Sequence, residues 1–279
     1  MIGNPSDAQL ENAVQYHYNG FPPRNLNLAN FIEPLIAATD ALARYDQMLK
    51  GLHNSEILLA PLRNQEAVIS SRMEGTVSTM DEILRYEADI ASDAPESQNS
   101  KTRSEVIETL LYPRALKSAH GAMREGYPLS KALLRSTHQQ LLSHGRGTLK
   151  NPGQFKREQN YLGNRATKSI TFVPIAPEQL EMGLDRMFDY GKATNVPPLV
   201  KAAVTHLEFE ALHPFEDGNG RLGRMLITLM LWNEGLISAP HFYISGYFEQ
   251  HKDEYIDTMR RVSSHSDWDR WCYFFLSAV

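Results

Sequence analysis

The sequence predicts an all-α protein that contains one short β-hairpin. Apolar side chains recur at spacings of three, four and seven residues along most of the 279-residue chain, which is typical of amphipathic helices. Capping residues and glycines stand where such helices would begin and end. Only residues 161–174 depart from this pattern, because they combine a Gly-Asn pair with a run of β-branched residues.

The first predicted helix is marked by regularly spaced apolar residues and ends at Gly51; these residues are Leu28, Phe31, Leu35, Leu42, Tyr45 and Leu49. A second helix is predicted from about residue 64 to Glu74, with Gly75 as its stop. A third begins near Thr79, which forms a capping box with Glu82. Residues 87–101 lack periodicity and predict a loop. Further helices are expected over about 102–124, 129–143, 177–192, 198–212, 221–234 and 249–262.

Two segments differ from the regular pattern of capped helices. Gly163 and Asn164 precede the β-branched run 169–173, and together they predict the hairpin. Residues 268–279 are aromatic and end without a capping signal. This end predicts a packed helix, and it leaves open whether the natural chain continues past Val279.

Composition narrows the functional classes. The formal net charge of −5 gives no general attraction to nucleic acid or anionic lipid, so this chain alone is not expected to bind either. Cys272 is the only cysteine, which excludes an internal disulfide and a cysteine-rich zinc site. No segment is long and apolar enough to cross a membrane, and no signal pattern begins the chain. These features predict a cytoplasmic protein.

The most informative segment is 213–224, His-Pro-Phe-Glu-Asp-Gly-Asn-Gly-Arg-Leu-Gly-Arg. Gly218, Asn219 and Gly220 stand just before a predicted helix, whose first amides and dipole favour a phosphate. Arg221 and Arg224 are three residues apart, so both can face the same anion from the first turn.

Two further side chains of this segment suit phosphate chemistry. Asp217 would repel bare phosphates unless Mg²⁺ lay between them. His213 titrates near neutrality and suits the role of general base.

The same residues also match other patterns. The pattern G-x-G-x-x-G at 218–223 follows a helix and not a strand, so a Rossmann site is excluded. Glu210-x-x-His213 lacks the second pair that a di-iron bundle needs. His206, Glu210 and His213 share a helical face, which leaves a mononuclear metal site open. A capped loop with Phe215 buried and the arginines solvated also remains open.

Residues 213–224 match, at every defining position, the signature H-x-F-x-[D/E]-G-N-G-R-x-x-R of the Fic (filamentation induced by cAMP) family. The chain also resembles that family over 152–163 and 172–177, which look like the entry to and exit from a flap hairpin. Residues 243–248 and Tyr255 look like the region after the catalytic helices. The resemblance covers roughly residues 20–279. Lys156 departs from it, because the family usually has arginine there.

The resemblance implies a mainly helical Fic fold and a transfer of AMP from ATP to a hydroxyl side chain of a target protein, with release of pyrophosphate. It implies that His213 deprotonates the hydroxyl and that Asp217 holds Mg²⁺. The hairpin at about 161–174 would hold the target by adding a strand. The resemblance implies that six residues form the nucleotide-binding loop, in which Phe215 is the anchor in the core. The phosphates would be bound by Gly218, Asn219, Gly220, Arg221 and Arg224.

The resemblance also implies an inhibitory element. Ser70-Ser-Arg-Met-Glu74-Gly75 matches the family pattern [S/T]-x-x-x-E-[G/N], in which Glu74 would pair with Arg224 and take the place of the ATP γ-phosphate. Without the resemblance, a surface glutamate beside a capping glycine is the plainer interpretation. Residues 1–100 are accordingly predicted to carry the inhibitory helix (about 64–75), and 101–279 to form a catalytic core packed as one unit.

Several alternatives stay open on the sequence alone. The same signature could transfer UMP, phosphocholine or phosphate, or remove AMP from a modified target with Glu74 positioning water. From a different class, the chain could be a nucleotide-sensing module of a longer DNA-binding protein. Self-modification and a homo-oligomer are also compatible with the sequence.

Overall fold

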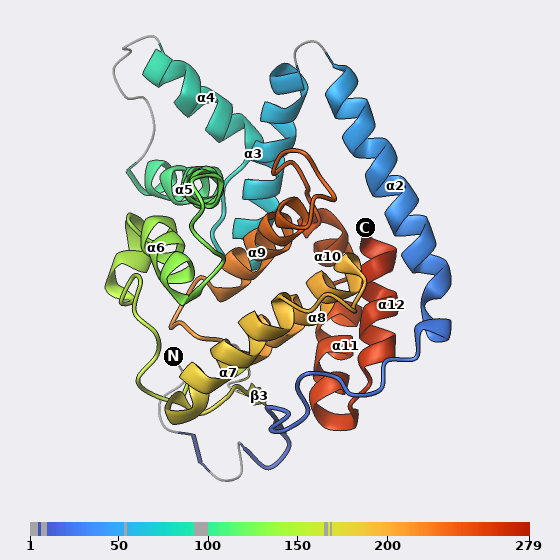
Figure 1. The fold of residues 1–279 in the computed structure, drawn as a ribbon. Helices are drawn as coiled ribbons and strands as arrows, with labels where there is room; N and C mark the ends of the chain where they lie inside the picture. Colours follow the sequence, from blue (N-terminus) through green and yellow to red (C-terminus); the bar gives the residue numbers. More distant parts are fainter. Residues whose placement is uncertain (1–4, 7–9, 53–54, 92–99, 165–166, 168) are drawn as a thin grey trace. The chain divides into compact units, whose positions relative to one another are not determined.

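The computed structural model describes residues 5–6, 10–52, 55–91, 100–164, 167 and 169–279. Within these residues it contains eleven α-helices and three short strands (Figure 1). The predicted fold class is therefore confirmed. No helix in the described part of the chain is long and apolar enough to cross a membrane.

The α-helices are α2 (Ile32–Gly51), α3 (Ser55–Met73), α4 (Met80–Ala91), α5 (Ser100–Arg124), α6 (Lys131–Leu141), α7 (Pro177–Gly191), α8 (Pro198–Leu212), α9 (Asn219–Asn233), α10 (Ser245–Gln250), α11 (Lys252–His265) and α12 (Trp268–Ala278). The strands are β1 (Val14–Gln15), β2 (Leu162–Asn164) and β3 (Ser169–Val173). Two short 3-10 helices, η1 (Leu28–Asn30) and η2 (Gly145–Leu149), complete the elements.

The chain divides into two compact units. One comprises Met1–Ala41, Phe155–Asn219 and His251–Val279, and the other comprises Leu42–Gln154 and Gly220–Gln250. The chain passes between them four times: within α2, after Gln154, at the start of α9 and after Gln250. The predicted division at residue 100 separates an inhibitory region from a catalytic core by role, and it stays a prediction.

The first unit is organised around α8, a helix that is apolar nearly all round and almost entirely buried. Helices α7 and α12 pack against it (Figure 1). The Trp271 indole in α12 donates a hydrogen bond of 2.8 Å to the carbonyl of Ala203 in α8. The prediction that the aromatic C-terminal segment is packed is therefore confirmed.

The first unit also contains the small sheet, whose strand order is β1-β3-β2. Strands β2 and β3 are antiparallel and form the predicted hairpin. Strand β1 pairs parallel to β3 on its other side. The sequence did not indicate β1, because two residues are too few to show a strand pattern.

In the second unit, α5 packs against α3, α4 and α6, while α10 packs against α3. Buried apolar side chains of α3, α4 and α5 form a common cluster, which consists of Val68, Ile83, Val106 and Leu110. The predicted capping box is present, because the Thr79 amide donates to Glu82 Oε2 (2.8 Å) and the Glu82 amide donates to Thr79 Oγ1 (3.2 Å).

Three predicted boundaries differ from the structure. Helix α3 begins at Ser55 and includes Pro61, because burial of residues such as Leu59 outweighs the backbone bond that proline removes. Helix α4 reaches Ala91 and α5 begins at Ser100, so most of the predicted 87–101 loop is either helical or lies outside the described residues (92–99). The helix predicted over 249–262 is two helices that meet at His251.

Candidate active site

The site begins where α8 ends. His213 is the C-cap of α8, with φ 45° and ψ 62°, and its amide donates to the carbonyl of Phe209 at 3.0 Å. This left-handed conformation costs a non-glycine residue energy, so the surroundings must maintain it. Its location at the first residue of the Fic signature is consistent with a functional constraint.

The loop after His213 is anchored by Phe215. The Phe215 side chain is fully buried, and its ring centroid lies 5.2 Å from that of Phe155. The Asn219 side chain holds the Phe215 backbone twice, accepting from its amide at 2.9 Å and donating to its carbonyl at 2.8 Å. The loop is therefore fixed by both packing and hydrogen bonds.

Asp217 stands at the turn that leads into α9. Its Oδ1 accepts the amide of Gly218 at 2.8 Å, and Gly218 has a φ of 75°, which glycine adopts without strain. A half-buried carboxylate oriented by the backbone suits Mg²⁺, which commonly uses one or two carboxylates together with phosphate oxygens. The donor set at Asp217 therefore fits this ion.

The first turn of α9 carries the two arginines. Arg221 and Arg224 are each only 2% exposed, although arginine is seldom fully buried without a partner. The alternative of a plain capped loop with solvated arginines is therefore excluded. Two guanidinium groups held out of water at a helix N-terminus favour an anion there.

Arg224 contacts the predicted inhibitory residues directly. Its Nε donates to Ser70 Oγ at 2.8 Å, and its Nη2 donates to the carbonyl of Ser70 at 2.9 Å. The same Nη2 also donates to Glu74 Oε1 at 3.1 Å. The Arg224 side chain is 2% exposed and that of Glu74 is 26% exposed. All three residues belong to the second unit, and the structure brings them together as the pattern indicated.

The backbone at the end of α3 fixes the position of Glu74. The amide of Gly75 donates to Arg72 O (2.9 Å) and that of Thr76 donates to Ser71 O (3.0 Å), which is a Schellman motif with Gly75 at φ 85°. The Glu74 carboxylate lies so close to Gly220 that a methyl group on this residue would collide with Glu74 Oε1. A carboxylate therefore sits on the N-terminus of α9, where an anion is favoured.

Two residues that the sequence did not indicate hold the end of α3. Arg146 Nη2 donates to the Thr76 hydroxyl (2.8 Å) and to the carbonyl of Glu74 (3.3 Å). The buried carboxylate of Glu108 accepts from the Arg146 amide at 3.0 Å and from the Thr76 hydroxyl at 3.4 Å. These contacts join α5 and η2 to the residue that carries the inhibitory carboxylate.

Lys156 and Asn160 lie beside the loop that follows α8. Lys156 is 6% exposed, and its Nζ donates to Asn160 Oδ1 (2.8 Å) and to the carbonyl of Leu212 (3.0 Å). Burial without a carboxylate among these contacts lowers the pKa of Lys156 from its ordinary value of 10.5 to about 7.

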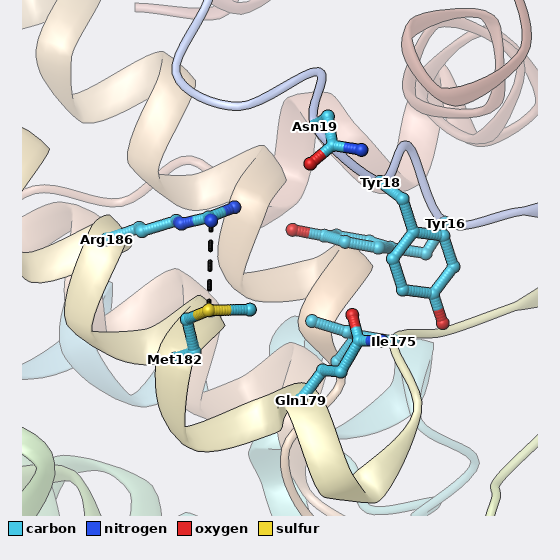
Figure 2. Close-up of a pocket in the computed structure, with 8 residues that line it drawn as sticks. Tyr16, Tyr18, Asn19, Ile175, Gln179, Met182 and Arg186 are labelled. Carbon is cyan, nitrogen blue, oxygen red and sulfur yellow. Dashed lines mark hydrogen bonds between the residues drawn. The ribbon is translucent and has the colours of Figure 1, made fainter.

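A cavity of about 340 Å³ lies beside the sheet of the first unit, and Tyr16, Tyr18, Gln179 and Arg186 are among its lining residues (Figure 2). The Tyr16 hydroxyl donates to the buried Glu208 at 2.7 Å. Burial, followed by the charge of Glu208, raises the pKa of Tyr16, so this hydroxyl stays protonated at neutral pH. The described residues that line the cavity include no histidine, cysteine, aspartate or glutamate, and the cavity is not the candidate catalytic centre.

The alternative metal site is not assembled. Among the described residues, no group of three or more His, Cys, Asp and Glu side chains is placed to hold a metal ion. His206, one of the three candidates, contacts the Tyr255 hydroxyl through Nε2 at 2.9 Å. The predicted helical face therefore does not form a mononuclear metal site, although it carries His206, Glu210 and His213.

Two family models match the chain. The model for the Fic/DOC family N-terminal region matches residues 32–121, and the model for the Fic/DOC family matches residues 128–231. Together they cover most of the chain, which belongs to the Fic/DOC family.

Similar proteins agree with this family. A protein adenylyltransferase, fic-1 of Caenorhabditis elegans, is 33% identical over 87 residues, which is 30% of this chain and 16% of the relative. A Fido domain-containing protein of Dictyostelium discoideum is 31% identical over 121 residues, 41% of this chain and 74% of the relative. The match thus spans less than a fifth of the nematode enzyme.

Solved structures share the fold at low identity. A Fic family protein from Desulfovibrio desulfuricans superposes with a TM-score of 0.71 and 20% identity, over 92% of this chain and 73% of the other. A fragment of Fic-1 from C. elegans, carrying one glutamate-to-glycine substitution, has a TM-score of 0.64 and 18% identity, over 88% and 68%. These likenesses establish the fold.

Proposed function

We propose that this protein transfers AMP from ATP to a hydroxyl side chain of a target protein and releases pyrophosphate. The observation that carries the proposal is the Fic signature itself, folded so that two buried guanidinium groups stand in the first turn of α9 and the preceding loop holds His213 in a strained conformation. The choice of AMP is supported by relatives named protein adenylyltransferase.

In this reaction the target hydroxyl oxygen forms a bond to the α-phosphorus of ATP. The bond between that phosphorus and the oxygen that bridges to the β-phosphate breaks, and pyrophosphate leaves with the bonding electrons. The His213 imidazole takes the hydroxyl proton, because histidine is the side chain that most often serves as a general base. Phosphoryl-type transfer depends chiefly on positioning and charge stabilisation, which a fixed loop and buried cations supply.

The remaining motif residues would handle the charge of the triphosphate. Arg221, Arg224 and the first amides of α9 would bind phosphate oxygens. Asp217 would hold Mg²⁺, which when bound offsets the negative charge of the phosphates. Phe215 and Asn219 keep the loop in place, and neither needs to touch the nucleotide to do so.

Glu74 would act as a brake on this site. Its carboxylate lies on Gly220 and accepts a bond from Arg224, so it occupies an anion position at the N-terminus of α9. A phosphate that needed the same place would have to displace it and would meet charge repulsion until it did. ATP would therefore bind in an unproductive way while the pair is intact.

The target protein would bind at the hairpin. Strand β3 is paired on both sides, to β1 and to β2, so the outer edge of β2 is the hairpin edge that can accept a further strand. Strand addition uses backbone bonds and fixes register without demanding much sequence. A hydroxyl residue of this chain presented in the same way would account for self-modification.

Labelled ATP tests the reaction type. A Glu74→Gly form, incubated with a cell lysate and ATP labelled at the α-phosphate, should transfer label to protein, and the same form with His213→Ala should not. ATP labelled only at the γ-phosphate should give no labelled protein. Label from the γ-position would show phosphate transfer, and loss of AMP from a previously modified target would show the reverse reaction. Equal labelling by the His213→Ala form would contradict the assigned base.

A further inference from the structure

Four consecutive backbone carbonyls surround His213, and every one of them accepts a hydrogen bond from the segment 156–160. Lys156 Nζ donates to Leu212 O at 3.0 Å, and the Lys156 amide donates to Pro214 O at 2.8 Å. The Asn160 amide nitrogen donates to His213 O at 3.0 Å and to Phe215 O at 3.2 Å. Two residues therefore bind the whole backbone from the last residue of α8 to the loop anchor.

This arrangement answers a specific structural need. The last carbonyls of a helix have no intrahelical partners, and the left-handed residue at position 213 carries a conformational cost. A buried carbonyl without a donor would add its own penalty. Hydrogen bonds to all four carbonyls favour this backbone conformation over other conformations, in which the His213 side chain would point in a different direction.

The two donors are themselves coupled. Lys156 Nζ donates to Asn160 Oδ1 at 2.8 Å, which orients the Asn160 amide so that its nitrogen faces the two carbonyls. The neighbouring Gln159 donates to the carbonyls of Asn160 and Pro174, both at 3.0 Å, and Pro174 directly follows β3. The same segment thus connects the base of the hairpin to the His213 loop.

We propose that Lys156 and Asn160 are positioning residues for the His213 imidazole and set the rate of the chemical step without binding ATP. This inference rests on the proposed AMP transfer. The segment 156–160 would then stabilise two parts of the site at once, namely the hairpin that binds the target and the loop that carries His213. A displacement of about 1 Å at a catalytic group can lower a rate by about 100-fold.

Three substitutions test the proposal in the Glu74→Gly form. Asn160→Asp keeps the size of the side chain and adds an ion pair with Lys156, but it replaces the donor to both carbonyls by an acceptor. Lys156→Met keeps the apolar stem and removes the Nζ donor. Lys156→Arg keeps a cationic donor. Arg157→Met, at the adjacent exposed position, is the matched control.

Asn160→Asp and Lys156→Met are expected to lower kcat by about 10- to 100-fold and leave the KM for ATP within about twofold. Lys156→Arg and Arg157→Met should keep kcat within about threefold of the parent. A rise in KM at constant kcat, or an unchanged kcat in both Asn160→Asp and Lys156→Met, would overturn the positioning role.

A second readout does not depend on transfer. The imidazole proton signals of His213, identified by their loss in His213→Ala, should shift in the NMR spectrum of Asn160→Asp and stay unchanged in Arg157→Met. An unchanged His213 signal in a folded Asn160→Asp form would overturn the proposal. If the Glu74→Gly parent transfers no AMP at all, the proposed function fails, whereas a shifted His213 signal would still support the positioning contact.

Discussion

Replacing Lys156 by methionine should remove a pH dependence from the stability of the folded chain. Lys156 is 6% exposed, and burial lowers its pKa from 10.5 to about 7. The folded chain therefore releases this proton near pH 7, while the unfolded chain keeps it until about pH 10. Between these values the unfolded state binds more protons, so stability rises with pH across that window.

The magnitude follows from the shift. The pKa of Lys156 differs by about 3.5 units between the unfolded and the folded chain, and each unit corresponds to about 1.36 kcal/mol. Burial of the charged amine therefore lowers the free energy of unfolding by at most about 5 kcal/mol, at pH values below about 7. Between about pH 7 and 9, the free energy of unfolding of the natural chain should rise by about 2 kcal/mol relative to Lys156→Met. The hydrogen bonds that methionine cannot make add a loss that is the same at both pH values.

Urea unfolding at the two pH values measures this difference. Tryptophan fluorescence is suitable, because Trp268 and Trp271 are buried in the same compact unit as Lys156. Arg157→Met, which removes an exposed cation, should follow the natural chain at both pH values. If the stability difference between the natural chain and Lys156→Met is the same at pH 7 and 9, the reasoning about the buried amine is refuted.

Two further predictions concern the brake and the loop anchor. Arg146→Ala removes the hydrogen bonds to the Glu74 carbonyl and the Thr76 hydroxyl, so it should weaken the hold on Glu74. AMP transfer, measured with α-labelled ATP, should rise by about fivefold at most, which is less than the rise in Glu74→Gly. A fall in transfer would contradict this. Phe215→Ala empties a fully buried position and should cost about 3–5 kcal/mol of stability in thermal or urea unfolding, and a loss below about 1 kcal/mol would contradict its anchoring role.

The sequence was most informative where local chemistry decides the structure. The capping box at Thr79 and Glu82, the stop at Gly75 and the bounds of α8 are each set by a few neighbouring residues, and the structure contains all of them. The hairpin was indicated for the same reason. The contact of Glu74 with Arg224 was predicted only through the resemblance, because the two residues are 150 positions apart.

Tertiary contacts account for what was missed. Arg146 and Glu108 are ordinary charged residues in the sequence, and their connection to Thr76 arises only when α5 and η2 pack beside α3. Lys156 stands where the family usually has arginine, but its bond to the carbonyl of Leu212 at the end of α8 cannot be derived from residue spacing. Strand β1 pairs with residues more than 150 positions away and consists of two residues, so no local pattern marks it.

The measurement that tests the central claim most directly is the rate of AMP incorporation by Glu74→Gly and by Glu125→Gly, compared with the natural chain. Glu125 is the matched control, because it too caps a helix in a Schellman motif before a glycine of positive φ, yet it is exposed. Release of Arg224 from Glu74 should raise incorporation by about tenfold or more in Glu74→Gly, while Glu125→Gly should match the natural chain. Equal rates in all three forms would show that the carboxylate on the N-terminus of α9 does not restrain the site.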